Sequence, residues 1–453
     1  MKKINLLNTS GKGLAPANLI VISFLSAILI GTILLVMPFS SKLGHSIGFI
    51  NALFTATSAV CVTGLVVADT ATTFSIFGQT VIIILIQLGG LGIMTAAALF
   101  SMILGRRMGL KERLTLQESI SEFNLQGIVK LFKNILIATF SIELAGAFIL
   151  SFSFIPIYGF VRGVAKSIFH SISAFCNAGF DIMGTAEQPF QSLTNLNNHA
   201  GIVIPIALLF ILGGMGFVVW RDIVRVRKFK EFMLHTKVVL IFSGILILTG
   251  TILFLLFEFN NTMEGMGFFQ KLMNAFFHSV TPRTAGFNTL DVASMTSQSQ
   301  LITIILMFIG AAPGSTAGGI KVTTFAIILF TVITYVRGIN DVNMMKRKVS
   351  ENIVKKSLSI VFMAFSLILL TTIVLLISEA GTLAECLFEA VSAFGTVGLS
   401  TGITPSLPFA GKIAIIITMF FGRVGPLAVA LSLTQSKANK QLFTYPEGKI
   451  SVG

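Results

Sequence analysis

The sequence predicts an all-α polytopic membrane protein in which four span–pore-loop–span repeats surround one central pore, with eight spanning helices and four re-entrant pore helices. Three observations lead to this prediction. The chain has too few charged residues for a soluble protein of its size. Eight apolar stretches are long enough to cross a bilayer, and one glycine-containing motif recurs four times at a nearly constant spacing.

The composition excludes most soluble classes of protein. Of the 453 residues, 54% are hydrophobic and 11% are charged, whereas soluble domains carry roughly 25% charged residues. Mean hydropathy is +0.91. A net charge of +14 would suggest nucleic-acid binding in a soluble protein, but in a membrane protein basic loops on one side account for it. The three cysteines have no metal-ligand spacing. Because basic loops on one side of a membrane explain the positive charge, we expect no nucleic-acid partner.

Eight stretches contain the roughly 20 mostly apolar residues that a spanning helix needs. They cover residues 20–37, 81–104, 135–157, 202–220, 238–257, 301–335, 358–377 and 413–433. The sixth stretch is too long for one straight span, because 35 residues would make a helix of about 52 Å at ~1.5 Å per residue.

Basic residues gather in alternate connecting segments. Segments 1–16, 104–134, 221–237, 337–356 and 434–453 hold 24 of the 32 Lys and Arg but only 8 of the 18 acidic residues, which gives them a net charge of +16 and the rest −2. Because positive charge stays on the cytoplasmic side, we expect both termini and three loops inside. These basic runs are topology determinants that contact lipid headgroups or, alternatively, a docking surface for a cytosolic partner.

We pair the eight spans in chain order, first with second and so on. The segment that connects the two spans of each pair contains a short amphipathic stretch that ends in a glycine motif. Gly64, Gly179, Gly286 and Gly398 are separated by 115, 107 and 112 residues, and a Phe lies ten residues before each of them. The third copy aligns better with a one-residue deletion. This period indicates an internal repeat. We divide the chain into a cytoplasmic tail (1–16), repeats at 17–110, 111–225, 226–345 and 346–435, and a second cytoplasmic tail (436–453).

The pattern is that of a pore loop, in which a half-helix enters from outside and an extended segment returns. Non-helical backbone at membrane depth is tolerated only where it is buried in protein or lines an aqueous path. Four such segments can present carbonyl rings that replace the hydration shell of a cation, and glycine permits the dihedral angles required. The predicted filter residues are Val62, Thr63, Gly64, Asn177, Ala178, Gly179, Thr284, Ala285, Gly286, Thr396, Val397 and Gly398.

The sixth apolar stretch is interrupted in its middle by residues 310–319, Gly-Ala-Ala-Pro-Gly-Ser-Thr-Ala-Gly-Gly. Glycine and proline at this density break a helix. Shorter glycine clusters lie at 89–92, 213–216 and 422–425. For these three we expect only a kink where helices cross closely. For 310–319, the length and polarity favour an obstruction on the ion path.

The chain resembles the membrane subunits of the Ktr–Trk–HKT superfamily of potassium transporters, and those of the Ktr type most closely. The resemblance extends from the first span to Tyr-Pro-Glu-Gly-Lys at 445–449. It rests on Cys-Val-Thr-Gly-Leu at 61–65, Asn-Ala-Gly-Phe at 177–180, Thr-Ala-Gly-Phe at 284–287 and Gly-Thr-Val-Gly-Leu at 395–399. Each copy keeps one glycine and lacks the Tyr-Gly that follows in tetrameric potassium channels, from which we infer fewer coordination sites and weaker rejection of sodium.

The resemblance implies a function: potassium uptake across a bacterial plasma membrane, by a multi-pass subunit whose transport is sodium-dependent. K⁺ is the transported ion, Na⁺ a coupling or stimulating ion, and neither an organic cofactor nor a further metal is implied. The implied partners are a second copy in a homodimer, membrane lipids, and a cytosolic nucleotide-binding regulatory subunit of the KtrA or KtrC type that forms an octameric ring.

The resemblance also implies an intramembrane gating loop. An arginine at membrane depth is costly and marks ion pathways, and Arg423 would lie beside this loop as an electrostatic barrier or a latch. Lys321 is either a second barrier or a side chain that extends toward the inner surface. The predicted gate residues are Gly310, Ala311, Ala312, Pro313, Gly314, Ser315, Thr316, Ala317, Gly318, Gly319 and Arg423.

For a few further polar residues, the sequence is compatible with more than one role. Asp69 and Asp181 either attract cations to the outer mouth or are solvated loop charges. Glu143 lies inside a span, where a structural role is favoured over a proton relay. Glu389, on the fourth pore helix, is expected to brace the filter through hydrogen bonds.

The alternative function is a secondary carrier for an organic substrate, with re-entrant packing helices. Such carriers usually have inverted or parallel repeats with a substrate site at the midplane, which four pore-loop repeats in one orientation do not match. The sequence has no hydrolase, metalloprotease, Walker or dinucleotide-binding motif, so we expect no enzyme and no catalytic residues.

Overall fold

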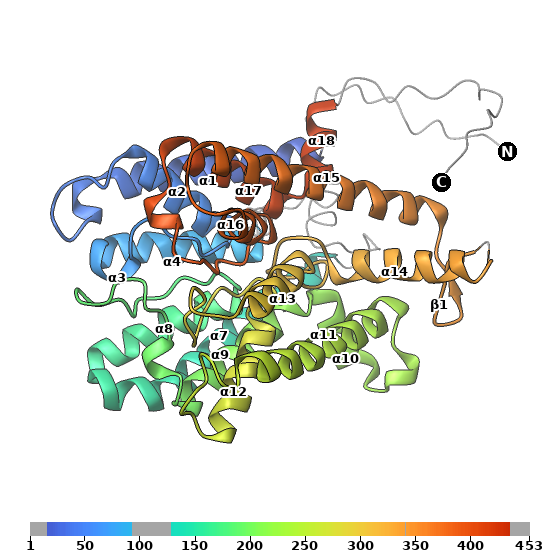
Figure 1. The fold of residues 1–453 in the computed structure, drawn as a ribbon, viewed down its shortest axis with the longest axis horizontal. Helices are drawn as coiled ribbons and strands as arrows, with labels where there is room; N and C mark the ends of the chain where they lie inside the picture. The colour runs from blue at the N-terminus through green and yellow to red at the C-terminus, as the bar shows by residue number, and fades with distance from the viewer. Residues whose placement is uncertain (1–15, 93–127, 340, 435–453) are drawn as a thin grey trace.

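The computed structural model describes residues 16–92, 128–339 and 341–434. In these residues the regular structure is helical except for a small hairpin of β1 (Asn343–Met344) and β2 (Arg347–Lys348), which pair antiparallel. The tails predicted at 1–16 and 436–453, the motif at 445–449 and most of the basic segment 104–134 lie outside the described residues. Figure 1 shows the helices as one tightly packed bundle.

The first helix of each repeat is long and apolar. These helices are α1 (Pro16–Val36), α7 (Ile128–Tyr158), α11 (Leu234–Glu258) and α15 (Glu351–Ile377). In the described part of the chain, four helices meet the length and composition needed to cross a membrane, and all four belong to this set. The first span predicted for each repeat is therefore confirmed.

The second helix of each repeat is too short to span. These pore helices are α2 (Phe49–Val60), α8 (Phe160–Phe175), α12 (Phe268–Val280) and α16 (Leu383–Gly395). Each buries the phenylalanine of its motif, namely Phe54, Phe169, Phe277 and Phe388. Burying a large aromatic side chain stabilises the packed state by roughly 1.5–3 kcal/mol, so the recurring Phe anchors each pore helix in the bundle.

The inner helices end earlier than the predicted apolar stretches do. They are α4 (Ile76–Leu91), α9 (Ala200–Gly214), α13 (Ser297–Phe308) and α17 (Phe409–Val424), and the last three are followed by α10 (Phe217–Val226), α14 (Val322–Val336) and α18 (Pro426–Thr434). The break between α13 and α14 was expected.

At the other glycine clusters the close approach that we expected is present, but the mere kink expected at 213–216 is wrong. Each of α4, α9 and α17 ends at its cluster, where Gly92, Gly216 and Gly425 have φ of 84°, 87° and 94°, and α9 and α10 meet at 93°. The reason is steric. A Cβ on Gly89, Gly213 or Gly422 would lie about 2 Å from a carbonyl oxygen at the end of a pore helix, so glycine is needed for the contact and then terminates the helix.

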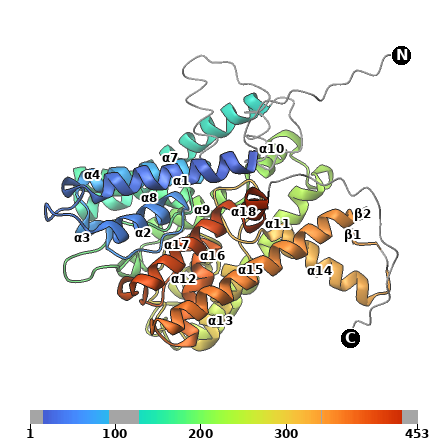
Figure 2. The same cartoon turned by 90° about the horizontal axis from the view of Figure 1, so that it is seen from above.

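The four repeats close into a ring. Within each repeat the first helix packs against its pore helix. Between repeats, the pore helix of one packs against the inner helix of the one before it: α8 on α4, α12 on α9, α16 on α13, and α2 on α17. Repeats 1 and 4, far apart in sequence, are therefore neighbours, and Figures 1 and 2 show their helices side by side.

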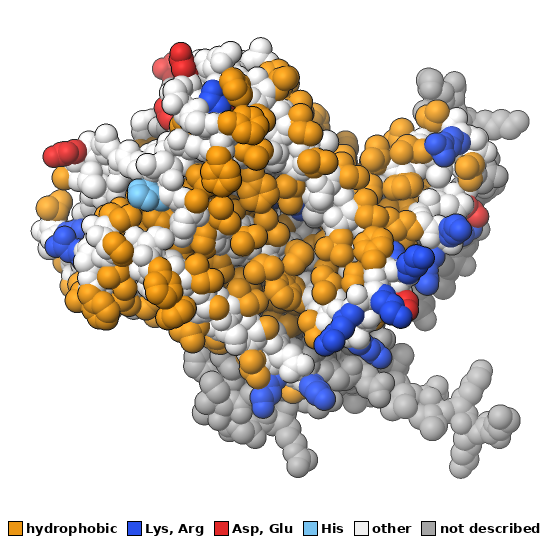
Figure 3. All heavy atoms as spheres, turned by 90° about the horizontal axis from the view of Figure 1, so that it is seen from below, with side chains coloured by type: hydrophobic (Ala, Val, Ile, Leu, Met, Phe, Trp, Pro, Cys, Tyr) orange, Lys and Arg blue, Asp and Glu red, His pale blue; other side chains and the backbone are white. Residues whose placement is uncertain are grey.

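Short elements complete the outer and connecting segments. They are α3 (Thr70–Thr73) and the 3-10 turns Pro38–Ser40, Thr194–Leu196, Phe229–Glu231 and Thr404–Ser406. On the face drawn in Figure 3, hydrophobic side chains form a broad band, and most Lys and Arg side chains gather along one side of it. This is the surface expected of a bundle immersed in a bilayer.

Candidate functional site

The four pore helices end where the predicted filter segments begin. In each segment the residue two positions before the glycine has a left-handed conformation, with φ of 56° at Val62, 58° at Asn177, 74° at Thr284 and 50° at Thr396. The glycines themselves have φ of 89°, 69°, 80° and 93°. Only the residue between them has an ordinary φ. Such alternation lets successive carbonyl groups face the same side of the chain, and glycine adopts it without strain.

The glycines form a closed ring around one axis. A Cβ on Gly64 would lie 2.5 Å from the carbonyl oxygen of Ala178, and one on Gly179 would lie 2.9 Å from that of Ala285. One on Gly286 would lie 2.3 Å from the oxygen of Val397, and one on Gly398 would lie 2.4 Å from that of Thr63. Each glycine thus faces the carbonyl before the glycine of the next repeat. The twelve predicted filter residues are brought together.

A hydroxyl group behind each filter segment holds it in place, and sequence reasoning missed these groups. Ser58 and Ser392 accept hydrogen bonds from the N–H groups of Gly64 and Gly398, at 3.1 and 3.2 Å. Ser173 and Thr281 instead donate to the carbonyls just after the second and third glycines. All four hydroxyls lie four residues after the buried Phe. That spacing was the available signal, and Thr281 fits it only with the one-residue deletion suspected in the third copy.

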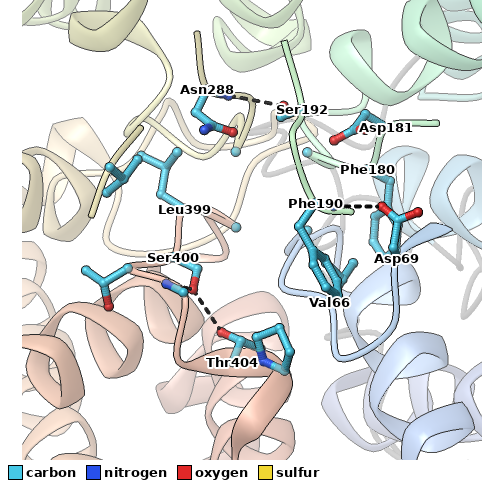
Figure 4. Close-up of a pocket in the computed structure, with 18 of the residues that line it drawn as sticks. Val66, Asp69, Phe180, Asp181, Phe190, Ser192, Asn288, Leu399, Ser400 and Thr404 are labelled. Carbon is cyan, nitrogen blue, oxygen red and sulfur yellow. Dashed lines mark hydrogen bonds between the residues drawn. The ribbon is translucent and has the colours of Figure 1, made fainter. Parts of the chain in front are cut away.

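One side of the ring, expected to be the outer one, opens into a vestibule of about 220 Å³. All four glycines line it, together with the residues that follow them in each repeat, and Figure 4 shows these segments around the cavity. Asp69 and Asp181 lie in its wall. Asp69 is buried and accepts hydrogen bonds from Thr72 and from the N–H of Phe190, so it is not a plain solvated charge. Burial raises the pKa of Asp181 to about 6.

The segment between α13 and α14 lies against the ring, next to residues that precede its glycines. The hydroxyl of Thr316 lies 3.2 Å from the carbonyl oxygen of Phe175 and 3.0 Å from the side-chain oxygen of Asn177. A Cβ on Gly318 would lie 2.2 Å from the hydroxyl oxygen of Thr396. The predicted gate residues are therefore in contact with filter residues of two other repeats.

Backbone hydrogen bonds fix the same segment to its neighbours. Toward repeat 2, the N–H of Ala312 donates to the carbonyl of Gly214 at 3.0 Å, and the N–H of Phe217 donates to the carbonyl of Gly314 at 2.9 Å. Toward repeat 4, the N–H of Gly319 donates to the carbonyl of Gly422 at 3.2 Å. Because its polar groups are satisfied by protein, this irregular backbone is compatible with membrane depth.

Arg423 joins this segment to repeat 1. Its guanidinium donates to the carbonyl oxygen of Thr316 in the segment and to those of Gly89 and Gly90 at the end of α4. Lys321 donates to the carbonyls of Ala317 and Gly318, at 2.7 and 3.2 Å, so it folds back onto the segment. Arg423, which belongs to repeat 4, therefore connects the segment of repeat 3 with the end of α4 in repeat 1.

Glu389 lies behind the fourth filter segment and is fully buried. Its carboxylate accepts hydrogen bonds from the hydroxyl of Ser400, from the N–H of Thr401 at 3.1 Å and from the hydroxyl of Thr404 at 2.7 Å. The expectation that Glu389 braces this part of the chain agrees with these contacts. Glu143 also has a partner, because Gln87 donates to its two oxygens at 3.0 and 3.2 Å.

We expect Glu389→Gln to loosen the loop that follows Gly398. Both carboxylate oxygens of Glu389 accept hydrogen bonds, and the amide nitrogen that replaces one of them in glutamine cannot accept any. A buried donor left without a partner costs about 1–3 kcal/mol. Thermal unfolding of the purified protein should occur at lower temperature, and discrimination between monovalent cations should fall. Glu379→Gln is the matched control, since Glu379 is exposed. Equal behaviour of the two variants would show that the brace has no such role.

A helical bundle with long apolar helices and a ring of four glycine segments is the architecture expected of a membrane protein that passes small ions. The model of the family described as "TrkH: Cation transport protein" matches residues 14–442. The chain belongs to this family. Its members are transport proteins, which confirms the expectation that the chain is no enzyme and favours the ion pathway over a carrier for an organic substrate.

Individual relatives agree with this assignment. The chain is 42% identical to the Ktr system potassium uptake protein B of Bacillus subtilis over 445 residues, covering 97% of both chains. It is 40% identical to the potassium/sodium uptake protein NtpJ of Enterococcus hirae, covering 98% of both. The crystal structure of the potassium transporter TrkH from Vibrio parahaemolyticus has the same fold, with a TM-score of 0.71 at 17% identity over 96% of this chain and 86% of that one.

Proposed function

We propose that this chain is the ion-translocating subunit of a Ktr-type potassium uptake system. The observation that carries the proposal is the closed ring in which each filter glycine faces a carbonyl of the next repeat. A ring of carbonyl oxygens can replace the hydration shell of a dehydrated cation. The ends of four pore helices point their partial negative charge toward the same axis. The names of the relatives in Bacillus and Enterococcus support K⁺ as the ion.

In this proposal, residues 310–319 close the pathway from the inner side and Arg423 holds them closed. The contacts of Thr316 and Gly318 with filter residues support the position of the gate. The bond from Arg423 to the Thr316 carbonyl supports a latch, since moving the segment must break it. Opening therefore means displacing one segment of one repeat, with the ring itself left in place.

The remaining parts of the proposal concern ions and partners. Sodium dependence is supported by the relative named for both potassium and sodium. The name "Ktr system" supports a multi-component assembly. We infer a homodimer in a bacterial plasma membrane, bound on its cytoplasmic side to a nucleotide-binding regulatory subunit. The basic segment 337–356 supplies a positively charged surface for that contact.

Flux measurements on purified protein in lipid vesicles test the function directly. We expect K⁺ uptake that an inward potassium gradient drives, with Na⁺ in the medium increasing its rate. Vesicles without protein and vesicles with an organic cation in place of K⁺ serve as controls. Uptake of an organic solute without K⁺ transport would contradict the proposal, and K⁺ uptake that Na⁺ leaves unchanged would refute the sodium dependence alone.

A further inference from the structure

An apolar groove of about 280 Å³ lies between α7 and α10, away from the ring. Its walls are Ile135, Ala138 and Ile142 of α7 and Phe217, Trp220 and Val224 of α10. Ala138 and Val224 are exposed in the bundle, so the groove is open on the outside. We infer that the groove opens toward the bilayer, because the residues of α7 that line it belong to a helix long and apolar enough to cross a membrane.

One end of the groove is strongly basic. Arg221 and Arg225 line it, and Arg227, Lys228 and Lys230 follow directly in the chain. α10 turns away from α9 by 93° and so does not continue the span. Phe217, Trp220 and Val224 line the groove on the same face of α10 as Arg221 and Arg225, so apolar and basic side chains lie side by side there, as they do in helices at the membrane interface. Trp220 is also typical of this interface.

The floor of the groove is shared with the proposed gate. Phe175 lines the groove, and its carbonyl oxygen lies 3.2 Å from the hydroxyl of Thr316. Phe217 lines it as well, and its N–H donates to the carbonyl of Gly314 at 2.9 Å. Whatever fills the groove therefore packs against two residues whose backbones hold the 310–319 segment.

We propose that this groove binds one acyl chain of an anionic phospholipid, whose phosphate lies against Arg221 and Arg225, and that the bound lipid restrains the 310–319 segment. An acyl chain gains little from leaving other lipid tails, because those are equally apolar. Selection among lipids must then come from the headgroup, and arginine binds phosphate through two parallel N–H groups. The restraint on the segment rests on the proposed function, whereas the binding of lipid does not.

The chain provides its own probe, because Trp220 is its single tryptophan. The protein is placed in phosphatidylcholine vesicles that contain increasing small fractions of phosphatidylglycerol with brominated acyl chains, which quench tryptophan on contact. We expect quenching that saturates at a low fraction of the anionic lipid. Arginine near an anionic surface favours binding about fivefold per side chain, so with Arg221 and Arg225 together brominated phosphatidylglycerol should be preferred over brominated phosphatidylcholine roughly 25-fold.

Two substitutions locate the site. Ala138→Phe fills the groove and should abolish the saturable quenching. Ala145→Phe makes the same change two turns further along α7, at an exposed position that does not line the groove. This variant should keep the saturable quenching. Arg225→Gln should lower the preference for the anionic lipid about fivefold. Unsaturable quenching that is equal for both lipids, or unchanged quenching in Ala138→Phe, would overturn the site.

Potassium uptake in the same vesicles tests the effect on the gate. If bound lipid restrains the segment, Ala138→Phe should respond less than Ala145→Phe to added phosphatidylglycerol. Saturable quenching with an equal uptake response in both variants would overturn the restraint. Absence of uptake in every lipid would count against the proposed function, and the fluorescence would still report binding.

Discussion

Gly64→Ser should strongly weaken the preference of uptake for potassium over sodium, although the protein remains folded in the membrane. Gly64 has a φ of 89°, and a Cβ there would lie 2.5 Å from the carbonyl oxygen of Ala178 and 3.1 Å from the Cα of Gly179. Both neighbours are backbone atoms of another repeat, so relief requires the ring itself to widen. Strained backbone costs about 1–3 kcal/mol, and each ~1.4 kcal/mol is tenfold in binding. We expect at least about a tenfold loss of preference for K⁺ over Na⁺, measured by competition of the two ions for uptake into vesicles.

Gly48→Ser separates the effect of the ring from general backbone strain. Gly48 lies in the same repeat with a φ of 87°, but a Cβ there meets nothing within 4 Å. This variant should retain selectivity. If it loses selectivity as Gly64→Ser does, or if both retain it, the ring of glycines is not the filter.

Arg423→Ala should raise the rate of potassium flux, because the proposed gate loses its tie to repeat 1. The guanidinium contacts the carbonyls of Thr316, Gly89 and Gly90. A hydrogen bond from a charged group contributes about 1.5–3 kcal/mol. Losing this amount from the closed state alone would raise the open population roughly tenfold or more. Initial rates of K⁺ uptake, normalised to the amount of protein in the vesicles, measure the change.

Lys412→Ala is the control for removing a positive charge from the same helix. Lys412 lies near the start of α17 and donates to the side chain of Asn51 at 3.0 Å, outside the gate. We expect this variant to transport at the unaltered rate. A flux in Arg423→Ala no greater than in Lys412→Ala would remove Arg423 from the gating mechanism.

The sequence was sufficient to predict the features that repeat. Four copies of one motif predicted four short helices and the four glycines that the structure places in a ring. The cyclic order of the repeats could not be read from it, because nothing local in the chain says that α2 packs on α17. For Arg423, the residues of the sequence alone predicted only that an arginine at membrane depth is energetically costly. An arginine at membrane depth requires partners, but the carbonyls that satisfy it come from segments more than 100 residues away.

The pattern of apolar residues did not predict where the inner helices end. A run of apolar residues is compatible with a straight span whether or not a carbonyl from elsewhere presses against its glycines. Only the fold reveals that Gly213 faces the carbonyl of Phe175 at a distance that excludes any side chain, and that the chain then turns through 93°. Tertiary contact, and not local propensity, determined where these helices end.

The four parts of the ring belong to one polypeptide, which has a consequence for how such a pore can change over evolution. In an assembly of identical subunits, every mutation is repeated around the axis, so no side can differ from the others. Here each side has its own residues: valine, asparagine and two threonines occupy the position two before the glycine. One side can acquire a movable insert and another its anchor, while the remaining sides keep the shape of the opening unchanged.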